Sequence, residues 1–234
     1  FACDNDNDLM ATERLQCSQI PQVFSTVGFA PFTDVTKSFD NMQKFNKHGP
    51  LFNSEYHPAR IDTWGHPKTV EPKLWASTLD KILAAKASVA FYVFHGGTNF
   101  GFTSGANYYR PHITSYDHVA PLTECGDPNP TYYAVRNVIG KYHVLPNMTL
   151  PKPAPKMELP NIKMKFVRNL FTLGDILGKA VESKFPLTFQ QLNIGSGFVL
   201  YSTTMKRKPD DPALLSIPGL ADRAEVFVDG EYQV

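Results

Sequence analysis

The distribution of apolar and polar positions predicts alternating strands and helices in the first part of the chain. Residues 22–27 and 49–54 are short runs typical of strands, and residues 88–94 form a nearly continuous apolar run. Continuous apolarity suits a strand buried on both faces of a parallel sheet. Residues 73–86 repeat apolar side chains at helical spacing after a proline, and residues 131–142 predict a second helix. Strand, helix and strand in this order predict a βαβ unit.

A proline-rich stretch at residues 145–160 interrupts this pattern. Such a run suits neither a helix nor a central strand, and predicts an extended linker. Beyond it, strand-like runs are separated by Gly and Pro, which predicts the opening strands of an all-β domain. These runs are 187–190, 197–202 and 223–229, with a short helix expected near 175–181. We therefore expect three parts, at residues 1–145, 146–160 and 161–234.

Both ends of the chain suggest a piece of a longer protein. The chain starts at Phe1 without a charged-then-apolar signal pattern. Residues 224–230 alternate as a strand and run into the turn dipeptide Asp229-Gly230 just before the last residues. We expect a hairpin whose returning strand the chain does not contain.

Composition excludes several classes of protein. The 234 residues are 42% hydrophobic and 19% charged, which is typical of a folded globular chain. The mean hydropathy of −0.25 and the lack of an apolar run of about 20 residues predict no membrane span. The 23 Lys and Arg residues balance 22 Asp and Glu residues, so there is no basic excess of the kind that nucleic acid binding requires.

The cysteines and one sequon bear on the cellular compartment. Cys3, Cys17 and Cys125 have no CxxC spacing, which argues against a zinc or thioredoxin-type site. One disulfide with one free thiol fits the count, and reduced core cysteines at positions 3 and 17 are the alternative. Asn147 begins the sequon Asn-Met-Thr, which would be glycosylated in the secretory route.

The sequence does not support a phosphate-binding loop, a metal site or a nucleophilic serine. The loop from Gly96 has the glycine spacing of a phosphate-binding loop, but Phe102 stands where that loop needs lysine. The histidines contain no HExxH motif, and the cluster of His112, Asp117 and His118 is more typical of a solvated loop than of a metal site. No GxSxG motif marks a nucleophilic serine.

The run Asn53-Ser54-Glu55-Tyr56 carries the most specific chemistry. It places a carboxylate at the C-terminal end of a predicted parallel strand, the edge at which βα-barrel sites assemble. A carboxylate and an aromatic ring at this position suit glycoside chemistry. The alternative is that Glu55 caps a helix or forms a structural salt bridge. At the same edge of the next strand, Gly96 and Gly97 would admit a ligand and Asn99 would supply an amide.

The sequence resembles family 35 glycoside hydrolases, specifically the animal acid beta-galactosidases. The resemblance extends past the linker, to segments like the start of the family's first β-domain, and covers essentially the whole chain. Its motifs are Gly-Pro-Leu-Phe-Asn-Ser-Glu-Tyr at 49–56, Asp-Thr-Trp-Gly at 62–65, Phe-His-Gly-Gly-Thr-Asn-Phe-Gly at 94–101, Ser-Tyr-Asp at 115–117 and Ala-Pro-Leu at 120–122.

The resemblance implies an α/β fold: a partial (β/α)8 TIM barrel, strands six to eight, followed by the start of an all-β domain of jelly-roll or galactose-binding type. It implies that Glu55 is the nucleophile of a retaining enzyme, and that the acid/base glutamate lies just upstream of Phe1. Tyr92 matches a tyrosine that lines the galactose pocket, with a core position as the alternative. Asn53, Tyr56 and His118 are the other expected substrate-binding residues.

The resemblance also implies a Cys3–Cys17 disulfide and a lysosomal or extracellular location. The short separation of these cysteines leaves no room for the helix and strand that the family has between them. We therefore expect an internal deletion near residues 4–8, with strand five lost. The expected partner is a β-galactoside, without cofactor or metal, and the resemblance admits a homodimer.

Three positions depart from the family pattern. His118 replaces a tyrosine that contacts the sugar, and His57 and Arg60 replace aromatics beyond the nucleophile. An imidazole can hydrogen-bond a sugar hydroxyl but offers less stacking area than a phenol. We expect the parent protein to hydrolyse terminal beta-D-galactose from glycans or glycolipids, and this chain alone to be inactive. The alternative is a catalytically silent sugar-binding or structural paralogue.

Overall fold

The computed structural model describes residues 2–5 (backbone only), 15–17, 19–57, 61–107, 110–117, 119–174, 176–206 and 214–233. Contacts divide the chain into two units: Phe1–Pro153 with Ile217–Val234, and Ala154–Ser216. Each unit is described by itself. The predicted site residues lie in the first unit.

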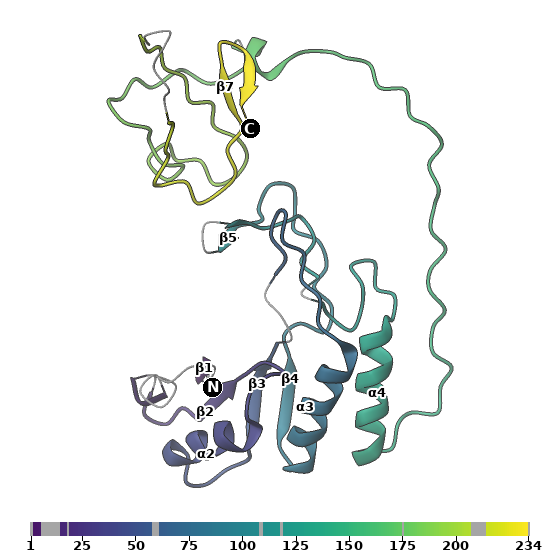
Figure 1. Cartoon of the computed structure of the whole chain (residues 1–234). Coiled ribbons are helices and arrows are strands. Elements are labelled where there is room, and N and C mark those ends of the chain that lie inside the picture. Colours follow the sequence, from purple (N-terminus) through teal and green to yellow (C-terminus); the bar gives the residue numbers. More distant parts are fainter. Residues whose placement is uncertain are drawn as a thin grey trace. The chain divides into compact units, whose positions relative to one another are not determined.

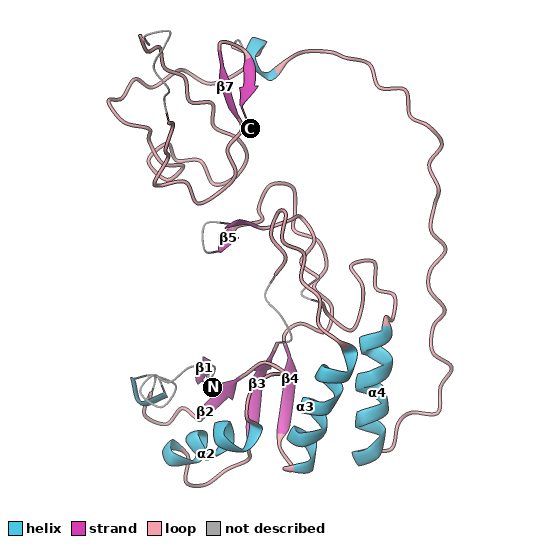
Figure 2. Cartoon of the chain, viewed as in Figure 1, coloured by secondary structure: helices cyan, strands magenta, loops and turns pink. Residues whose placement is uncertain are grey.

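A four-stranded parallel sheet is the frame of the first unit (Figures 1 and 2). Its strands, in spatial order, are β1 (Ala2–Asn5), β2 (Ser25–Gly28), β3 (Phe52–Tyr56) and β4 (Ser88–Phe91). The register pairs Val27 with Asn53 and Asn53 with Val89, and it shifts toward the C-terminal ends of β2 and β3. The expected strands at 22–27, 49–54 and 88–94 are therefore present with different bounds.

Strand β1 was not predicted. Its residues, Ala2 to Asn5, pair in parallel with Ser25 to Gly28. The run is only four residues long and half of it is polar, so it has no hydrophobic pattern of its own, and its assignment depends on pairing with β2. The expected deletion near residues 4–8 falls mainly outside the described residues.

Three helices follow strands or loops of this sheet. They are α2 (Val35–Phe45), α3 (Pro72–Ala84) and α4 (Pro130–Tyr142). The last two confirm the expected helices within one or two residues. Asn129 caps α4 by accepting hydrogen bonds from the main-chain N–H groups of Thr131 and Tyr132, and a proline starts each of α3 and α4.

Helix α2 was also not predicted, although its signals are readable. Asp34 accepts a hydrogen bond from the Lys37 N–H at 3.2 Å, as an N-cap does. Val35, Phe39 and Met42 are buried and recur at helical spacing. The helix packs against β2 and, less extensively, against α3.

An aromatic cluster joins the sheet to α3. The ring of Tyr56 lies edge-on to Trp75 at 5.2 Å and to Phe91 at 5.6 Å, while Trp75 and Phe91 stack at 5.7 Å. The Tyr56 hydroxyl donates a hydrogen bond to the Trp75 carbonyl at 2.9 Å. Tyr56 and Trp75 are fully buried, so this cluster fixes β3 and β4 against the helix.

Above the C-terminal end of β4, residues 92–129 form a folded loop region. It contains the two-residue strands β5 (Ala106–Asn107) and β6 (Arg110–Pro111), which pair antiparallel. Gly96 sits against the backbone of Tyr116: a Cβ at this glycine would lie 1.5 Å from the Tyr116 carbonyl oxygen. The Tyr116 N–H in turn donates to the Gly97 carbonyl at 2.9 Å.

From His143 onward, the described chain is mostly irregular. Residues 146–160 are extended and almost all exposed, as expected for a linker, and Asn147 is exposed within them. The strands expected at 187–190 and 197–202 do not form, and the described part of 175–181 is not helical. A 3-10 helix at Leu170–Thr172 is the one helical element described there.

A closed hairpin corrects the prediction for the C-terminal region. Strands β7 (Val226–Val228) and β8 (Glu231–Gln233) pair antiparallel, so the returning strand is present. Asp229 and Gly230 both have positive φ, 50° and 87°, as in a two-residue type I′ turn. Such a tight turn lets a few residues complete the hairpin.

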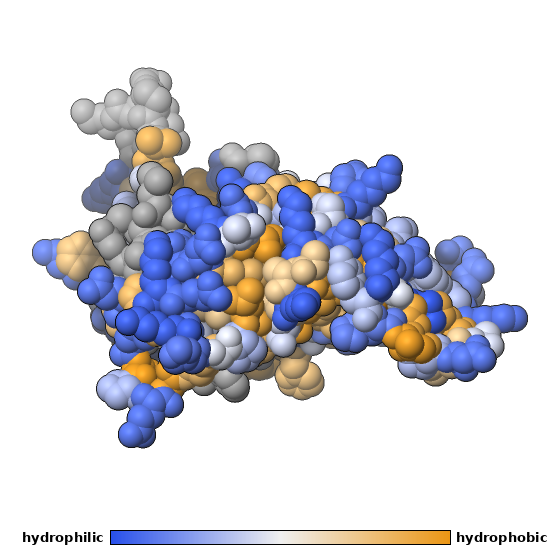
Figure 3. All heavy atoms as spheres, turned by 90° about the horizontal axis from the view of Figure 1, so that it is seen from below, coloured by the Kyte–Doolittle hydropathy of each residue, from blue (hydrophilic) through white to orange (hydrophobic). Residues whose placement is uncertain are grey.

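Polar and apolar surfaces are interspersed on the face in Figure 3. Among the described residues, no helix is both long and apolar enough to cross a membrane. A groove of about 550 Å³ is lined by residues of α2, α3 and the segments beside them, including Phe39 and Lys81. None of the predicted site residues lines this groove.

We expect Tyr56→Phe to destabilise the protein by about 1 kcal/mol, since it removes a buried hydrogen bond to a main-chain carbonyl. Urea denaturation followed by tryptophan fluorescence measures the change. Tyr133→Phe, at a 46% exposed position, is the matched control and should change the free energy of unfolding by less than about 0.5 kcal/mol. Equal stability of the two variants would contradict the role given to Tyr56.

Gly96→Ala should destabilise the protein by about 1–3 kcal/mol, because the added methyl group overlaps the Tyr116 carbonyl. The same urea denaturation measures this loss. Gly105→Ala is the control in the same loop region, since its nearest non-neighbouring atom is 3.9 Å from the added Cβ. A Gly96→Ala protein as stable as Gly105→Ala would show that the close approach is not required.

Candidate active site

Glu55 lies at the C-terminal edge of the parallel sheet, as the sequence predicts. Glu55 lies one residue before the buried Tyr56, in the part of β3 where the register with β2 and β4 shifts. The Glu55 side chain is 47% exposed. A half-exposed carboxylate at this edge can meet a ligand from solvent.

The side chain of Asn53 holds the backbone of Glu55 in place. Its side-chain oxygen accepts a hydrogen bond from the Glu55 N–H at 3.1 Å, and its amide donates to the Phe29 carbonyl at 3.4 Å. The residue is fully buried. These contacts fix the strand end, and the expected contact of Asn53 with a sugar stays a prediction.

Tyr56 lies on the helix side of the sheet, and its expected contact with substrate stays a prediction. Its ring is fully buried among Trp75 and Phe91, on the helix side of the sheet. Burial raises the pKa of its phenol far above the usual value.

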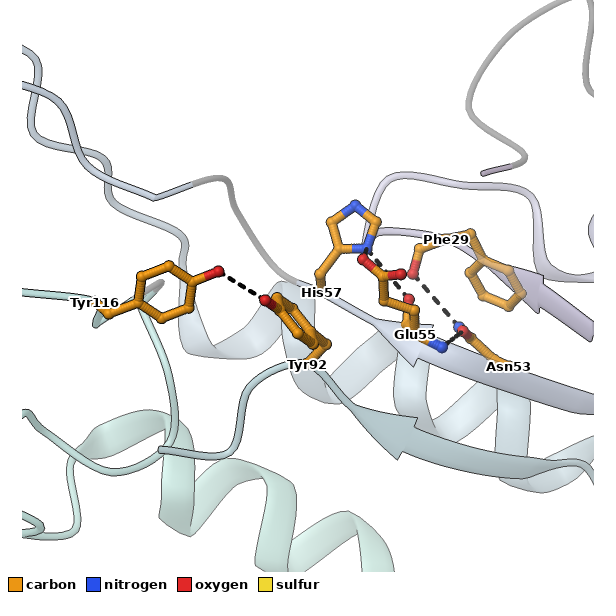
Figure 4. Close-up of polar contacts among 6 residues, drawn as sticks. All are labelled: Phe29, Asn53, Glu55, His57, Tyr92 and Tyr116. Carbon is orange, nitrogen blue, oxygen red and sulfur yellow. Dashed lines mark hydrogen bonds and ion pairs between the residues drawn. The ribbon is translucent and has the colours of Figure 1, made fainter. Parts of the chain in front are cut away.

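His57 contacts Glu55 twice. Its Nδ1 lies 3.2 Å from the Glu55 carbonyl oxygen and 3.9 Å from the Glu55 Oε1 (Figure 4). The imidazole is 16% exposed. It therefore belongs to the immediate surroundings of the carboxylate, as its position in the sequence suggests.

Tyr92 continues the sheet toward the loops. Its N–H donates to the Tyr56 carbonyl at 3.0 Å, and its ring is 40% exposed. This exposure argues against a core position. Phe91, the last residue of β4, packs with the helix-side cluster, and Tyr92 begins the loop region.

Tyr116 was missed as an individual site residue, although the Ser-Tyr-Asp motif contains it. Its hydroxyl lies 2.6 Å from the Tyr92 hydroxyl, and the two point toward one another in Figure 4. Partial burial, the hydrogen bond with Tyr92 and the nearby charge of Glu55 together raise the pKa of Tyr116 to about 12. Tyr116 therefore stays protonated across the pH range in which glycosidases work.

The glycines after β4 have a role different from the expected one. Gly96 admits the backbone of Tyr116 rather than a ligand. The Asn99 N–H donates to the Thr114 carbonyl at 2.8 Å, and its side-chain nitrogen is buried with no partner described. The contact of Gly96 with Tyr116 and the hydrogen bond of Asn99 with Thr114 both join the two arms of the loop region.

A carboxylate strengthens the same junction. Thr98 Oγ1 donates to the Glu124 carboxylate, and the His95 ring nitrogen Nε2 lies 3.0 Å from the Glu124 carbonyl. Hydrogen bonds from Thr98 and Ser115 lower the pKa of Glu124. Glu124 thus serves the loops rather than the chemistry.

Several expected residues remain untested. His118 and Arg60 lie outside the described residues, as does the side chain of Cys3. Cys17 is exposed and has a free thiol, so this structure does not contain the Cys3–Cys17 disulfide. Among the described residues, no group of His, Cys, Asp and Glu side chains is arranged to hold a metal ion.

Sequence comparisons with known proteins assign this chain to a family. Residues 2–142 match the model of "Glycosyl hydrolases family 35", and residues 186–234 match "Beta-galactosidase, first all-beta domain". The chain is 40% identical over 225 residues to the "Beta-galactosidase-1-like protein" of Mus musculus, covering 92% of this chain and 35% of that protein.

The true beta-galactosidases are similar to the same degree. The human "Beta-galactosidase" is 40% identical over 222 residues, which cover 92% of this chain and 33% of that protein. The "Beta-galactosidase" of Mus musculus is 37% identical over 261 residues, covering 98% of this chain and 40% of that protein. The chain thus spans about a third of the length of these relatives, and it belongs to glycosyl hydrolase family 35, with the family's catalytic region followed by the first all-beta domain.

Proposed function

We propose that this chain supplies the nucleophile of a retaining beta-galactosidase, and that Glu55 is that nucleophile. The observation that supports this most directly is the half-exposed Glu55 carboxylate at the C-terminal edge of a parallel sheet. Asn53 fixes its backbone, and Tyr92, which follows the neighbouring strand β4, bonds to the Tyr56 carbonyl. The substrate would be a terminal, non-reducing beta-D-galactose of a glycan or glycolipid.

The proposed chemistry is a double displacement. The Glu55 carboxylate attacks the anomeric carbon while the bond to the leaving oxygen breaks, and a second carboxyl group gives that oxygen its proton. Water, deprotonated by the same second group, then attacks the galactosyl ester and releases galactose with the anomeric configuration retained. The second group is the acid/base glutamate expected before Phe1.

The remaining surroundings suit this role. Tyr92 and Tyr116 contribute two hydroxyl groups near the carboxylate, and His57 adds an imidazole beside it. Tyr92 and His118 are the proposed sugar contacts. Asn147 is exposed, so its sequon would be open to glycosylation in the secretory route, which suits the proposed lysosomal or extracellular location.

The rival function is sugar binding without turnover. It is favoured by one observation: His57 contacts Glu55 where the family has an aromatic residue. An imidazole that occupies the nucleophile's surroundings would reduce the stacking area offered to a sugar. Such a paralogue would bind galactose and leave Glu55 unmodified.

Incubation of the full-length protein with an activated 2-deoxy-2-fluoro-galactoside should trap the ester on Glu55. The fluorine slows both steps, and the good leaving group lets the first proceed, so the intermediate accumulates. Peptide mass spectrometry should find the added mass on the peptide that contains Glu55, and Glu55→Gln should abolish it. Mass on another peptide would refute this nucleophile. Galactose binding without any labelling would favour the rival function.

The 234-residue chain alone should not turn over a nitrophenyl galactoside. Its sheet has four described strands, whereas a closed barrel of this class has eight, and the acid/base group is expected before Phe1. Release of nitrophenol by this chain, measured at 405 nm on the scale of about an hour against a Glu55→Gln control, would contradict the expectation.

A further inference from the structure

Two tyrosines from distant parts of the chain share one hydrogen bond at the candidate site. Tyr92 follows β4, and Tyr116 lies 24 positions later in the loop region. Their hydroxyl oxygens are 2.6 Å apart, a short distance for an O–H···O bond. In Figure 4 both phenols approach this contact end to end.

The backbone of Tyr116 is held independently of its hydroxyl. Its N–H donates to the Gly97 carbonyl at 2.9 Å, and its carbonyl lies against Gly96, which has no side chain to displace it. Next to it, Asp117 accepts from the Ala120 N–H at 3.1 Å and so fixes the following turn. The phenol therefore projects from a rigid support toward Tyr92.

The short contact fixes the two hydroxyl groups relative to one another. A hydroxyl pair has one donor and one acceptor, and either oxygen can take either role here. Tyr116 is partly buried and near the negative charge of Glu55, and both conditions raise the pKa of its phenol to about 12. The hydroxyl that accepts keeps its own proton for a further acceptor.

We propose that Tyr116 is a positioning residue: its hydroxyl bonds to the Tyr92 hydroxyl and so holds the Tyr92 phenol in place at the candidate site. Tyr92 can then donate to the Glu55 carboxylate or to charge that develops there. The catalytic part of this inference rests on the proposed function, whereas the orientation of Tyr92 by Tyr116 does not.

The test uses single-atom deletions in the full-length protein. Tyr116→Phe should lower kcat about 3- to 10-fold with KM changed less than about 2-fold, as expected for loss of one neutral hydrogen bond that acts in the transition state. Tyr92→Phe should lower kcat at least as much. The double variant should be no slower than Tyr92→Phe, because Tyr116 acts only through Tyr92.

The matched control is Tyr142→Phe on α4. It also removes a tyrosine hydroxyl with a short hydrogen bond, here 2.8 Å to Asp80, and it lies outside the candidate site. Its kcat should equal that of the unmodified protein. Additive effects of Tyr92→Phe and Tyr116→Phe, or an unchanged kcat in Tyr116→Phe, would overturn the proposal.

A spectroscopic measurement separates this inference from the proposed function. In protein labelled at the tyrosine Cζ with ¹³C, the resonance of Tyr92, assigned by its loss in Tyr92→Phe, should move in Tyr116→Phe and stay in Tyr142→Phe. A Tyr92 resonance that does not move in Tyr116→Phe would overturn the positioning role even in an active enzyme. A moved resonance in a protein that fails to label at Glu55 would support the positioning and refute only the proposed function.

Discussion

The site depends on the burial of Tyr56 against Trp75. Successive residues of a strand point to opposite faces, so the ring that enters the helix-side cluster determines which way Glu55 points. A slip of one residue in β3 would bury the carboxylate and expose the phenol. The free energy of packing two large aromatic side chains, with one hydrogen bond between them, opposes this slip.

The second support comes from the loops beyond β4, and it uses backbone rather than side chains. Gly96 lets one segment of the loop region lie directly on another. The hydrogen bonds of Gly97, Asn99 and Glu124 hold these two segments together. Tyr116 therefore reaches Tyr92 from a fixed base. The sheet places the carboxylate, and the loops place the hydroxyl groups around it.

Sequence patterns predicted the helices α3 and α4 and the approximate positions of three strands, because each has strong periodicity or a clear capping residue. They also placed Glu55 correctly at the strand end. The burial of Tyr56 and Asn53 could not be predicted, since motif position alone does not say which face of a strand is buried. β1 was not predicted because its pairing is set by tertiary context. The β7–β8 hairpin was predicted without its returning strand because a type I′ turn needs few returning residues. Tyr116 carried a motif but no local signal, as its role arises from contact with a residue far away in sequence.

The loop between Gly97 and Tyr116 is tied together at its base. Thr98 and Ser115 form an antiparallel bridge, Asn99 bonds to Thr114, and Gly97 bonds to Tyr116. The residues within the loop, including β5 and β6, can therefore change in length and composition while the base keeps its geometry. Related proteins can in this way differ in the part of the chain between these ties, while the base keeps Tyr116 in the same position relative to Tyr92.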